Sequence, residues 1–276
     1  MKIAFITRTE AKNISDLENQ NDLQRLIELA GTVKACVMYI VSNFEDKNYK
    51  LVNNSTPIIV IEDNNPISPI SINKVLNEIA NNKKTKKEPD VFLVCSKEVD
   101  LKECHIRKLI KEIQRDKLLV VGYRFRITDI TGTTDKKLDK ELQDYYNNKD
   151  LIAFRVPWNT CAVWNYGLFD DYVTEFDEIT SKNPFNPVCV CIDNVCTQTE
   201  HKGMEDGLAI AKASSRKEKQ KIYFKLLDDR LSWRVNSDYD KRLNHRRKLA
   251  RKDTVLRNFM AVKNYSEKDL KNAEIK

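Results

Sequence analysis

The sequence predicts an α/β fold in which a mostly parallel sheet is flanked by helices. Short apolar runs of strand length alternate along the chain with segments in which apolar residues recur every three to four positions. The chain has 276 residues, of which 41% are hydrophobic, and this is sufficient for a substantial core. Polar, turn-forming stretches separate the runs, so each run has the length of a single element.

The first half of the chain follows this alternation closely. Apolar runs predict four strands, which are Lys2–Thr7, Lys34–Val41, Pro57–Ile61 and Val91–Cys95. Helical spacing predicts helices at Leu23–Ala30 and Ile72–Asn81, and a third helix with its apolar face at Ile106, Leu109, Ile110 and Ile113. A fifth strand, Leu118–Gly122, follows this helix. Strands and helices in this order are typical of a parallel sheet.

The second half is less regular. Asp129–Asp150 is polar and predicts a loop, order returns at Leu151–Val156, and a turn-rich break at Asn183–Pro187 precedes a short strand, Val188–Ile192. From Ser214 onward the pattern predicts helices. One carries Ile222, Tyr223, Leu226 and Leu227, and another carries Leu243, Ala250, Leu256, Phe259 and Met260. We therefore expect a main α/β domain at residues 1–213 and a C-terminal helical extension at residues 214–276.

Charge and composition restrict the class of protein. Lys212–Lys276 contains 20 Lys and Arg against 9 Asp and Glu, a net charge of +11, so with +7 for the whole chain the first 211 residues carry about −4. No run of about 18 apolar residues occurs, which predicts a cytoplasmic protein without a transmembrane segment, at most peripheral at a membrane surface. The chain has seven cysteines, an odd number, which indicates reduced, mostly buried thiols. It has only six glycines and no glycine-rich motif, which argues against phosphate binding through a Rossmann or Walker loop.

Several short motifs follow one another in a fixed order. The first strand ends in Thr7–Glu10, a helix contains Lys74–Asn77, the central strand is followed by Glu98–Asp100, and Phe176–Glu178 precedes Gly203–Asp206. In this order the motifs resemble those of the family 2 glycosyltransferases, which are inverting enzymes of the GT-A fold. The resemblance covers about the first 215 residues. It implies a nucleotide-sugar-binding and catalytic domain at residues 1–213.

The resemblance also implies an activity. We expect a hexosyltransferase-type enzyme that moves one sugar from a nucleoside diphosphate donor, a UDP or GDP sugar, to an acceptor hydroxyl with inversion and with metal assistance. The acceptor classes left open are glycan, lipid and nucleic acid. The arginine and tryptophan motif of processive family members is absent, which favours a single transfer. The alternative is a nucleic-acid binding or modifying protein that uses the basic C-terminal helices.

Two carboxylates follow the central strand, where an open α/β sheet presents groups to a ligand. The resemblance implies that Glu98 and Asp100 contact a divalent cation, Mn²⁺ or Mg²⁺, or the diphosphate. Glu98 stands where the family has aspartate, which leaves metal dependence open. Asp100 together with Glu103 also fits a capping box at the start of the next helix. His201 is a third candidate for contact with the metal or the diphosphate.

The catalytic base is expected in the last motif. Inversion requires a group that takes the proton of the acceptor hydroxyl, and the resemblance implies Asp206 for this role, with Glu205 as the second candidate. Both residues also precede the helical run Gly207–Ala213, so an interaction with the helix dipole is the alternative.

Nucleotide-sugar contacts are expected over the carboxyl ends of the first strands. Glu62 and Asp63, after the third strand, compete for this role, and the candidates that follow the first two strands, Thr7, Arg8, Glu10 and Asn43, equally fit turns. The candidates are Thr7, Arg8, Glu10, Asn43, Asn77 and Ser96.

An aromatic and amide cluster after Pro157 suits an acceptor sugar, because rings cover the apolar face of a pyranose and amides reach its hydroxyls. Its members are Trp158, Asn159, Thr160 and Trp164. Tryptophans at this spacing more often fill a core.

Two further groups have chemistry-bearing residue types. Segment 181–202 contains Cys189, Cys191, Cys196 and His201, but their spacing differs from that of paired-cysteine zinc sites, and buried thiols fit better. In the basic stretch 242–252, Arg246 and Arg251 are the candidates for phosphate contact, and a solvated helix face is the alternative.

Overall fold

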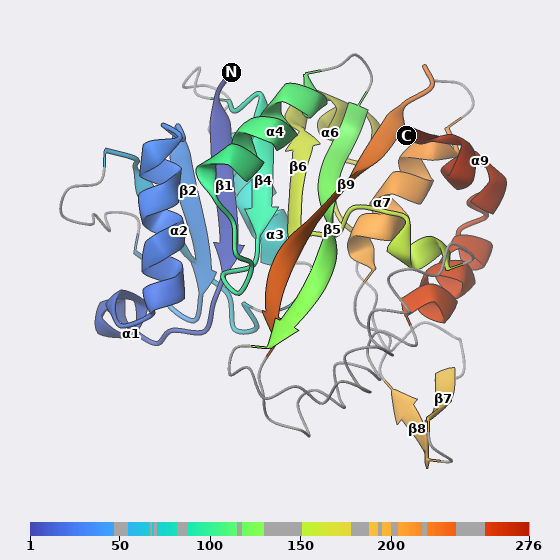
Figure 1. Ribbon diagram of the computed structural model, residues 1–276, viewed down its shortest axis with the longest axis horizontal. Coiled ribbons are helices and arrows are strands. Elements are labelled where there is room, and N and C mark those ends of the chain that lie inside the picture. The colour runs from blue at the N-terminus through green and yellow to red at the C-terminus, as the bar shows by residue number, and fades with distance from the viewer. Residues whose placement is uncertain are drawn as a thin grey trace.

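The computed structural model describes residues 1–46, 55–66, 68, 71–81, 88–114, 118–129, 151–177, 188–192, 195–199, 204–216, 220–235 and 252–275. Eight strands of this part of the chain form the main sheet, in the order β10-β9-β5-β6-β4-β1-β2-β3, and β7 and β8 form a separate two-stranded sheet (Figure 1). The predicted α/β class, with a mostly parallel sheet flanked by helices, is confirmed.

The elements have the following bounds. The strands are β1 (Ile3–Arg8), β2 (Val37–Ser42), β3 (Ile58–Glu62), β4 (Val91–Cys95), β5 (Leu118–Asp129), β6 (Cys161–Asn165), β7 (Val188–Ile192), β8 (Val195–Thr199), β9 (Tyr223–Val235) and β10 (Glu274–Ile275). The α-helices with described bounds are α1 (Ile14–Glu18), α2 (Asn21–Thr32), α3 (Ser71–Asn81), α4 (Glu103–Ile113), α6 (Tyr166–Tyr172), α7 (Glu205–Ser214) and α9 (Glu267–Asn272). A short 3₁₀ helix covers Ile152–Phe154, and residues 252–262 are also helical.

Strand direction brings most strand ends to one rim of the main sheet. β1 pairs in parallel with β2 and β4, β2 pairs in parallel with β3, and β9 pairs in parallel with β5 and β10. β6 runs antiparallel to both β4 and β5. The start of β6 therefore lies beside the carboxyl end of β4, where Cys95 pairs with Cys161. This rim is where an open α/β sheet binds ligands.

Helices cover both faces of the sheet. In Figure 1, α2 and α4 lie in front of the strands, whereas α3 and α6 lie behind them. The apolar positions of α3 recur at Ile72, Val75, Leu76 and Ile79, and all four side chains are buried, as their spacing predicts. No helix among the described residues is long and apolar enough to cross a membrane.

Most of the predicted elements are confirmed. The strand Val91–Cys95 has the predicted bounds, and all five residues are buried, as expected for a central strand covered on both faces. The strand Val188–Ile192 also has the predicted bounds, and it pairs antiparallel with β8, within the segment between Phe176–Glu178 and Glu205. β5 is longer than expected and continues beyond Gly122 to Asp129. Segments 130–150 and 178–187 lie outside the described residues.

The helix predicted from Ile222 to Leu227 is wrong. The apolar residues from Ile222 to Leu227 predict a helix, but residues Tyr223–Val235 form β9, which lies between β5 and β10. Phe224, Leu226 and Leu227 are all buried. A strand that is buried on both faces shows a nearly continuous apolar run, which periodicity alone does not distinguish from a short helix. The segment after residue 214 thus supplies two strands of the main sheet as well as helices.

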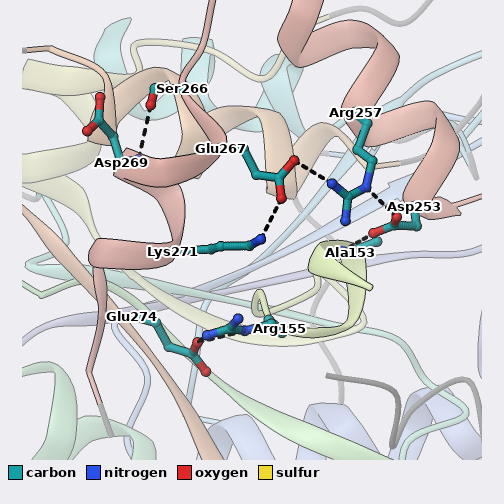
Figure 2. A network of polar contacts seen from close by, with 9 residues as sticks. All are labelled: Ala153, Arg155, Asp253, Arg257, Ser266, Glu267, Asp269, Lys271 and Glu274. Carbon is teal, nitrogen blue, oxygen red and sulfur yellow. Dashed lines mark hydrogen bonds and ion pairs between the residues drawn. The ribbon is translucent and has the colours of Figure 1, made fainter. Parts of the chain in front are cut away.

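The C-terminal helices are joined to the segment before β6 by polar contacts, which Figure 2 shows. Asp253 accepts a hydrogen bond from the backbone N–H of Ala153 at 3.0 Å and from Arg257 Nε at 2.6 Å. Arg257 also pairs with Glu267, which in turn pairs with Lys271 at 2.6 Å. Arg257 and Lys271 therefore neutralise carboxylates of the same chain.

Of the second predicted C-terminal helix, Leu256, Phe259 and Met260 lie in the helical residues 252–262 and are buried. Leu243 and Ala250 lie outside the described residues. The predicted boundary at residue 213 stays a prediction.

Candidate functional site

The candidate site lies at the rim where β1 and β4 end and β6 begins. Ile6 pairs with Val94, so continuing the parallel register places Arg8 at the level of Ser96. The backbone N–H of Ser96 donates to the carbonyl oxygen of Thr160 at 2.9 Å. The backbone N–H of the neighbouring Asn159 donates to Asp206 Oδ2 at 2.8 Å. These contacts join the end of β1, the end of β4, the start of β6 and the start of α7 in one location.

Arg8 is the last residue of β1 and lies within this group. Its Nη1 donates to the carbonyl oxygen of Ser68 at 2.7 Å. Burial lowers the pKa of Arg8, and the carboxylates of Glu205, Asp206 and Glu98 act in the opposite direction. The guanidinium therefore lies in the field of the acidic residues from both predicted acidic motifs.

The loop after β4 holds its two carboxylates in different ways. The Ser96 hydroxyl donates to Glu98 Oε2, and Glu98 is one of the groups that act on Arg8. Asp100 Oδ1 instead contacts Arg25 Nη1 at 3.3 Å, and its side chain is 48% exposed. Arg25 Nη2 also donates to the carbonyl oxygen of Val99 at 2.7 Å, so α2 anchors this loop.

The alternative role of Asp100 as a helix cap is wrong. α4 begins at Glu103, and its N-cap is Lys102, whose backbone N–H donates to His105 Nδ1 at 3.1 Å. His105 thus satisfies a free backbone donor near the helix start, a role that the sequence motif attributes to Glu103. Asp100 lies before this turn, and Arg25 is its ion-pair partner.

The start of α7 presents the second acidic pair. Met204, the N-cap residue, has a φ of 77°, a left-handed conformation that is unusual for a residue with a side chain. Glu205 and Asp206 follow and are 5% and 4% exposed. Asp206 accepts backbone hydrogen bonds at both oxygens, from Asn159 at Oδ2 and from Gly207 at Oδ1 at 2.7 Å. The alternative helix-end role of Asp206 is thus present together with its place at the rim.

Burial has a strong effect on Asp206. Burial, which removes solvent from the carboxylate, is the largest cause that raises the pKa of Asp206, and repulsion from Glu205 is the second. Together they raise this pKa to about 7. The charge of Lys252 and the backbone N–H groups of Asn159 and Gly207 oppose this shift. A carboxyl group with a pKa near neutrality is suited to proton transfer, because it is partly ionised and still basic.

Asn159 lies beside this carboxylate with unused hydrogen-bonding capacity. Its side chain is 2% exposed, and its Oδ1 accepts from Trp164 Nε1 at 2.9 Å. Its Nδ2 has no hydrogen-bond partner among the described residues. A buried donor without a partner costs free energy, so Asn159 Nδ2 is an unsatisfied polar group of the core beside Trp164.

The two predicted acceptor-binding tryptophans differ. Trp164 is fully buried and stacks on Phe92 with ring centroids 6.2 Å apart, so it fills the core, as the alternative interpretation has it. Trp158 donates from Nε1 to the carbonyl oxygen of Ala153 at 2.7 Å, and Lys252 Nζ lies 3.6 Å from its ring centroid. Lys252 comes from the C-terminal helical residues 252–262, which therefore reach the site. Thr160 is half-buried.

The other residues predicted to contact the nucleotide sugar differ in burial and in their position along the strands and helices. Thr7 is buried, and its hydroxyl has no partner among the described residues. Glu10 is exposed and Asn43 is half-buried, each shortly after a strand end. Asn77 is exposed in the interior of α3, more than a turn from the helix start that faces the rim, so the structure does not bring it to the other candidates.

Lys97 is a residue that the sequence did not single out. Its Nζ donates to Thr9 Oγ1 at 2.9 Å and to Gln20 Oε1 at 2.6 Å, which places a second cation between the loop after β4 and the segment after β1. Its position between Ser96 and Glu98 is the only signal that could have indicated it. Arg25 carries no comparable signal, because its contacts come entirely from the packing of α2.

Several of the described carboxylate oxygens at this rim already have partners, whereas a hard divalent cation is held by one or two carboxylates together with phosphate oxygens. Asp100 contacts Arg25, both oxygens of Asp206 accept backbone N–H groups, and Glu98 Oε2 accepts the Ser96 hydroxyl. No three His, Cys, Asp or Glu side chains gather as a possible metal site within the part of the chain that is described. The predicted ligand His201 and the predicted phosphate contacts Arg246 and Arg251 lie outside it.

Three solved structures similar to this chain have low identity to it. S. aureus TarS (residues 1–349) is 14% identical with a TM-score of 0.48, covering 93% of this chain and 69% of TarS. A mycobacterial protein is 8% identical with a TM-score of 0.41, covering 91% of this chain and 73% of that protein. GalNAc-T7, in a structure with UDP, GalNAc and Mn²⁺, is 11% identical with a TM-score of 0.47, covering 84% of this chain and 44% of GalNAc-T7.

No protein-family model and no curated protein sequence matches the chain. The TM-scores of the three structures all lie below 0.5.

Proposed function

We propose that this chain is a glycosyltransferase that moves a single sugar from a nucleoside diphosphate donor to an acceptor hydroxyl with inversion. The observation that carries the proposal is Asp206, a buried carboxylate with a pKa raised to about 7 at the ligand-binding rim of an α/β sheet. Arg8, in the field of the same carboxylate, supplies positive charge for a diphosphate. We keep the sequence-based expectation of a UDP or GDP sugar, and of a glycan, lipid or nucleic-acid acceptor.

The chemical step follows from these groups. The acceptor oxygen forms a bond to the anomeric carbon while the bond from that carbon to the diphosphate oxygen breaks, and the electron pair of the broken bond stays on the diphosphate. Asp206 takes the proton of the acceptor hydroxyl as the new bond forms.

A nucleic-acid binding role is the less favoured alternative. That role needs the positive charge of the C-terminal segment to be available to phosphates. In the described part of this segment, Arg257 pairs with Asp253 and Glu267, Lys271 pairs with Glu267, and Lys225 pairs with Glu112 (Figure 2 shows the first two groups). These charges are therefore satisfied within the chain.

A thermal-shift measurement with UDP, GDP, CDP and dTDP in the presence of Mn²⁺ tests whether a nucleotide binds. A nucleotide at 100 times its Kd stabilises the folded chain by about 2.7 kcal/mol, so we expect one of the four to give a clear rise in melting temperature. If none of them stabilises protein that is shown to be folded, the proposed function is wrong.

The Asp206→Asn variant tests the assigned base. Using the nucleotide that binds, we expect release of nucleoside diphosphate from the corresponding sugar donors to fall by about 100-fold to 10,000-fold, because the variant has no proton acceptor at this position. Donor binding should stay close to that of the unchanged chain. Asp170→Asn, which changes an exposed carboxylate on α6, is the matched control and should keep full activity.

A further inference from the structure

We propose that the nucleoside diphosphate binds to this chain without a divalent cation, and that the Arg8 guanidinium takes the place of the metal at the end of β1. The inference rests on the proposed function and adds to it the source of the positive charge. It departs from the expectation that the resemblance raises, which is metal assistance through Glu98 and Asp100.

The first argument is the state of the carboxylates. A cation held by one or two carboxylates and by phosphate oxygens needs those carboxylates to face the ligand. The Asp100 carboxylate faces Arg25, which also donates to the carbonyl oxygens of Lys97 and Val99 at 3.3 and 2.7 Å. These contacts make Asp100 part of the support of the loop, so Glu98 is the only member of the predicted pair at the rim.

The second argument is the position of Arg8. β1 pairs with β2 on one side and with β4 on the other, so Arg8 ends a strand within the parallel part of the sheet. The carboxylates of Glu205 and Asp206 from α7, and of Glu98 from the loop after β4, all act on it in the direction that raises its pKa. A divalent cation bound by these carboxylates would lie close to the positively charged guanidinium of Arg8. Like charges at short range repel strongly in a partly buried site.

The third argument is the capacity of Arg8 to bind a further group. A guanidinium carries five N–H donors, and the one hydrogen bond found for Arg8 among the described residues is that from Nη1 to Ser68. Glu205, Asp206 and Glu98 act on Arg8 electrostatically, and no ion pair between Arg8 and a carboxylate is found among the described residues. The remaining donors suit two oxygens of a diphosphate, which arginine binds as a fork.

Lys97 adds a second fixed charge to the same rim. Its ammonium group is held by the oxygens of Thr9 and Gln20, and it has a third N–H donor. A diphosphate bound at Arg8 therefore develops its leaving-group charge beside a preorganised cation, which costs no reorganisation when the bond to the sugar breaks. The transfer needs no co-reactant other than the donor and the acceptor.

The experiment compares nucleotide binding with and without metal. Wild-type protein is first treated with EDTA and then titrated calorimetrically with UDP, GDP, CDP and dTDP, once in EDTA and once in Mn²⁺. We expect the nucleotide that binds to do so with a Kd in EDTA within about threefold of its Kd in Mn²⁺. Binding in Mn²⁺ alone would overturn the inference and leave the proposed function standing, whereas no binding in either condition would overturn both.

Two substitutions test the part assigned to Arg8. Arg8→Gln removes the charge, and we expect the Kd measured in EDTA to rise by about 10-fold to 100-fold, because a charge-assisted hydrogen bond is lost. Arg8→Lys keeps the charge but loses the forked geometry of the guanidinium, and its Kd should lie between that of the wild type and that of Arg8→Gln. Arg124→Gln, which changes an arginine paired with the exposed Asp228, is the matched control and should bind as the wild type does. Equal binding by folded Arg8→Gln and wild type would contradict the inference.

Discussion

At the scale of single residues, Asp206 shows how one buried carboxylate affects activity and stability in opposite ways. Its side chain is 4% exposed, and burial together with Glu205 raises its pKa to about 7. The ionised form, which the proposed reaction requires, is therefore the form that the fold disfavours. Two pH dependences with opposite signs follow from this single group.

Activity should increase with pH. If Asp206 is the base, kcat/KM for the sugar donor rises as the pH passes through about 7, because the carboxyl group loses its proton in that range. A pH series of initial rates checks this expectation. A profile that is flat between pH 5.5 and 8.5 would remove Asp206 from the role of base.

Stability should decrease over the same range. An ordinary aspartate in the unfolded chain ionises near pH 4, whereas folded Asp206 keeps its proton up to about pH 7. The contribution of this group is complete below about pH 4 and is lost as the pH rises to 7, with a slope of up to about 1.4 kcal/mol per pH unit.

Urea unfolding at several pH values measures this slope. Asp206→Asn should reduce the slope between pH 5 and 7, whereas Asp170→Asn, the exposed control, should leave it unchanged. An unchanged slope in Asp206→Asn would mean that Asp206 ionises normally in the folded chain.

At the scale of elements, the segment that carries Trp158 and Asn159 depends on a close approach between β5 and the chain before β6. A Cβ atom added to Gly122 of β5 would lie 2.7 Å from Pro157 Cβ and 3.2 Å from the carbonyl oxygen of Cys161. Both neighbours belong to or adjoin the turn that leads into the site. Glycine at this position therefore allows the turn to pack directly on the strand.

Gly122→Ala should destabilise the fold by about 1 to 3 kcal/mol, because the neighbours are a proline ring and backbone rather than a flexible side chain. Gly167→Ala in α6 is the matched control. Its nearest atom would be Asn165 Oδ1 at 3.7 Å, so it should be neutral or stabilise the fold by up to about 1 kcal/mol. Urea unfolding of both variants measures the difference, and equal stabilities would contradict this account of the turn.

The element scale also shows where the sequence was informative. Val91–Cys95 and Val188–Ile192 were predicted with their observed bounds, because each is a short apolar run between turn-forming residues. Ile222–Leu227 was predicted as a helix and is part of β9, because two apolar pairs at helical spacing also occur in a strand that is covered on both faces. The partners that decide between the two, β5 and β10, are far away in the sequence.

At the scale of the whole molecule, the C-terminal segment is part of the main sheet. β9 pairs with β5 over most of the length of both strands and also with β10. Asp253, Arg257 and Glu267 connect the C-terminal helices to one another and to Ala153 (Figure 2). Residues 1–213 and the described part of residues 214–276 therefore share one sheet and one set of polar contacts.

A chain that ends at residue 213 should fail to fold cooperatively, because β5 loses its pairing partner and the buried side chains of β9 are missing. Thermal unfolding followed by circular dichroism checks this. A chain that ends at residue 273, which lacks only β10 and the contact between Arg155 and Glu274, should still unfold cooperatively. A sharp transition in the shorter chain would show that residues 1–213 are an independent domain.

The sequence by itself determined the α/β class and most of the first half of the fold, because local periodicity and turn residues specify short elements without reference to distant parts of the chain. It also indicated Asp206, Glu205, Arg8 and Glu98 as candidates. Only the tertiary structure decided what these side chains meet, such as Asp100 with Arg25, Lys97 with Thr9 and Asp206 with the N–H of Asn159. Charge partners and burial depend on residues that are distant in sequence, and the chemistry of a carboxylate depends on both.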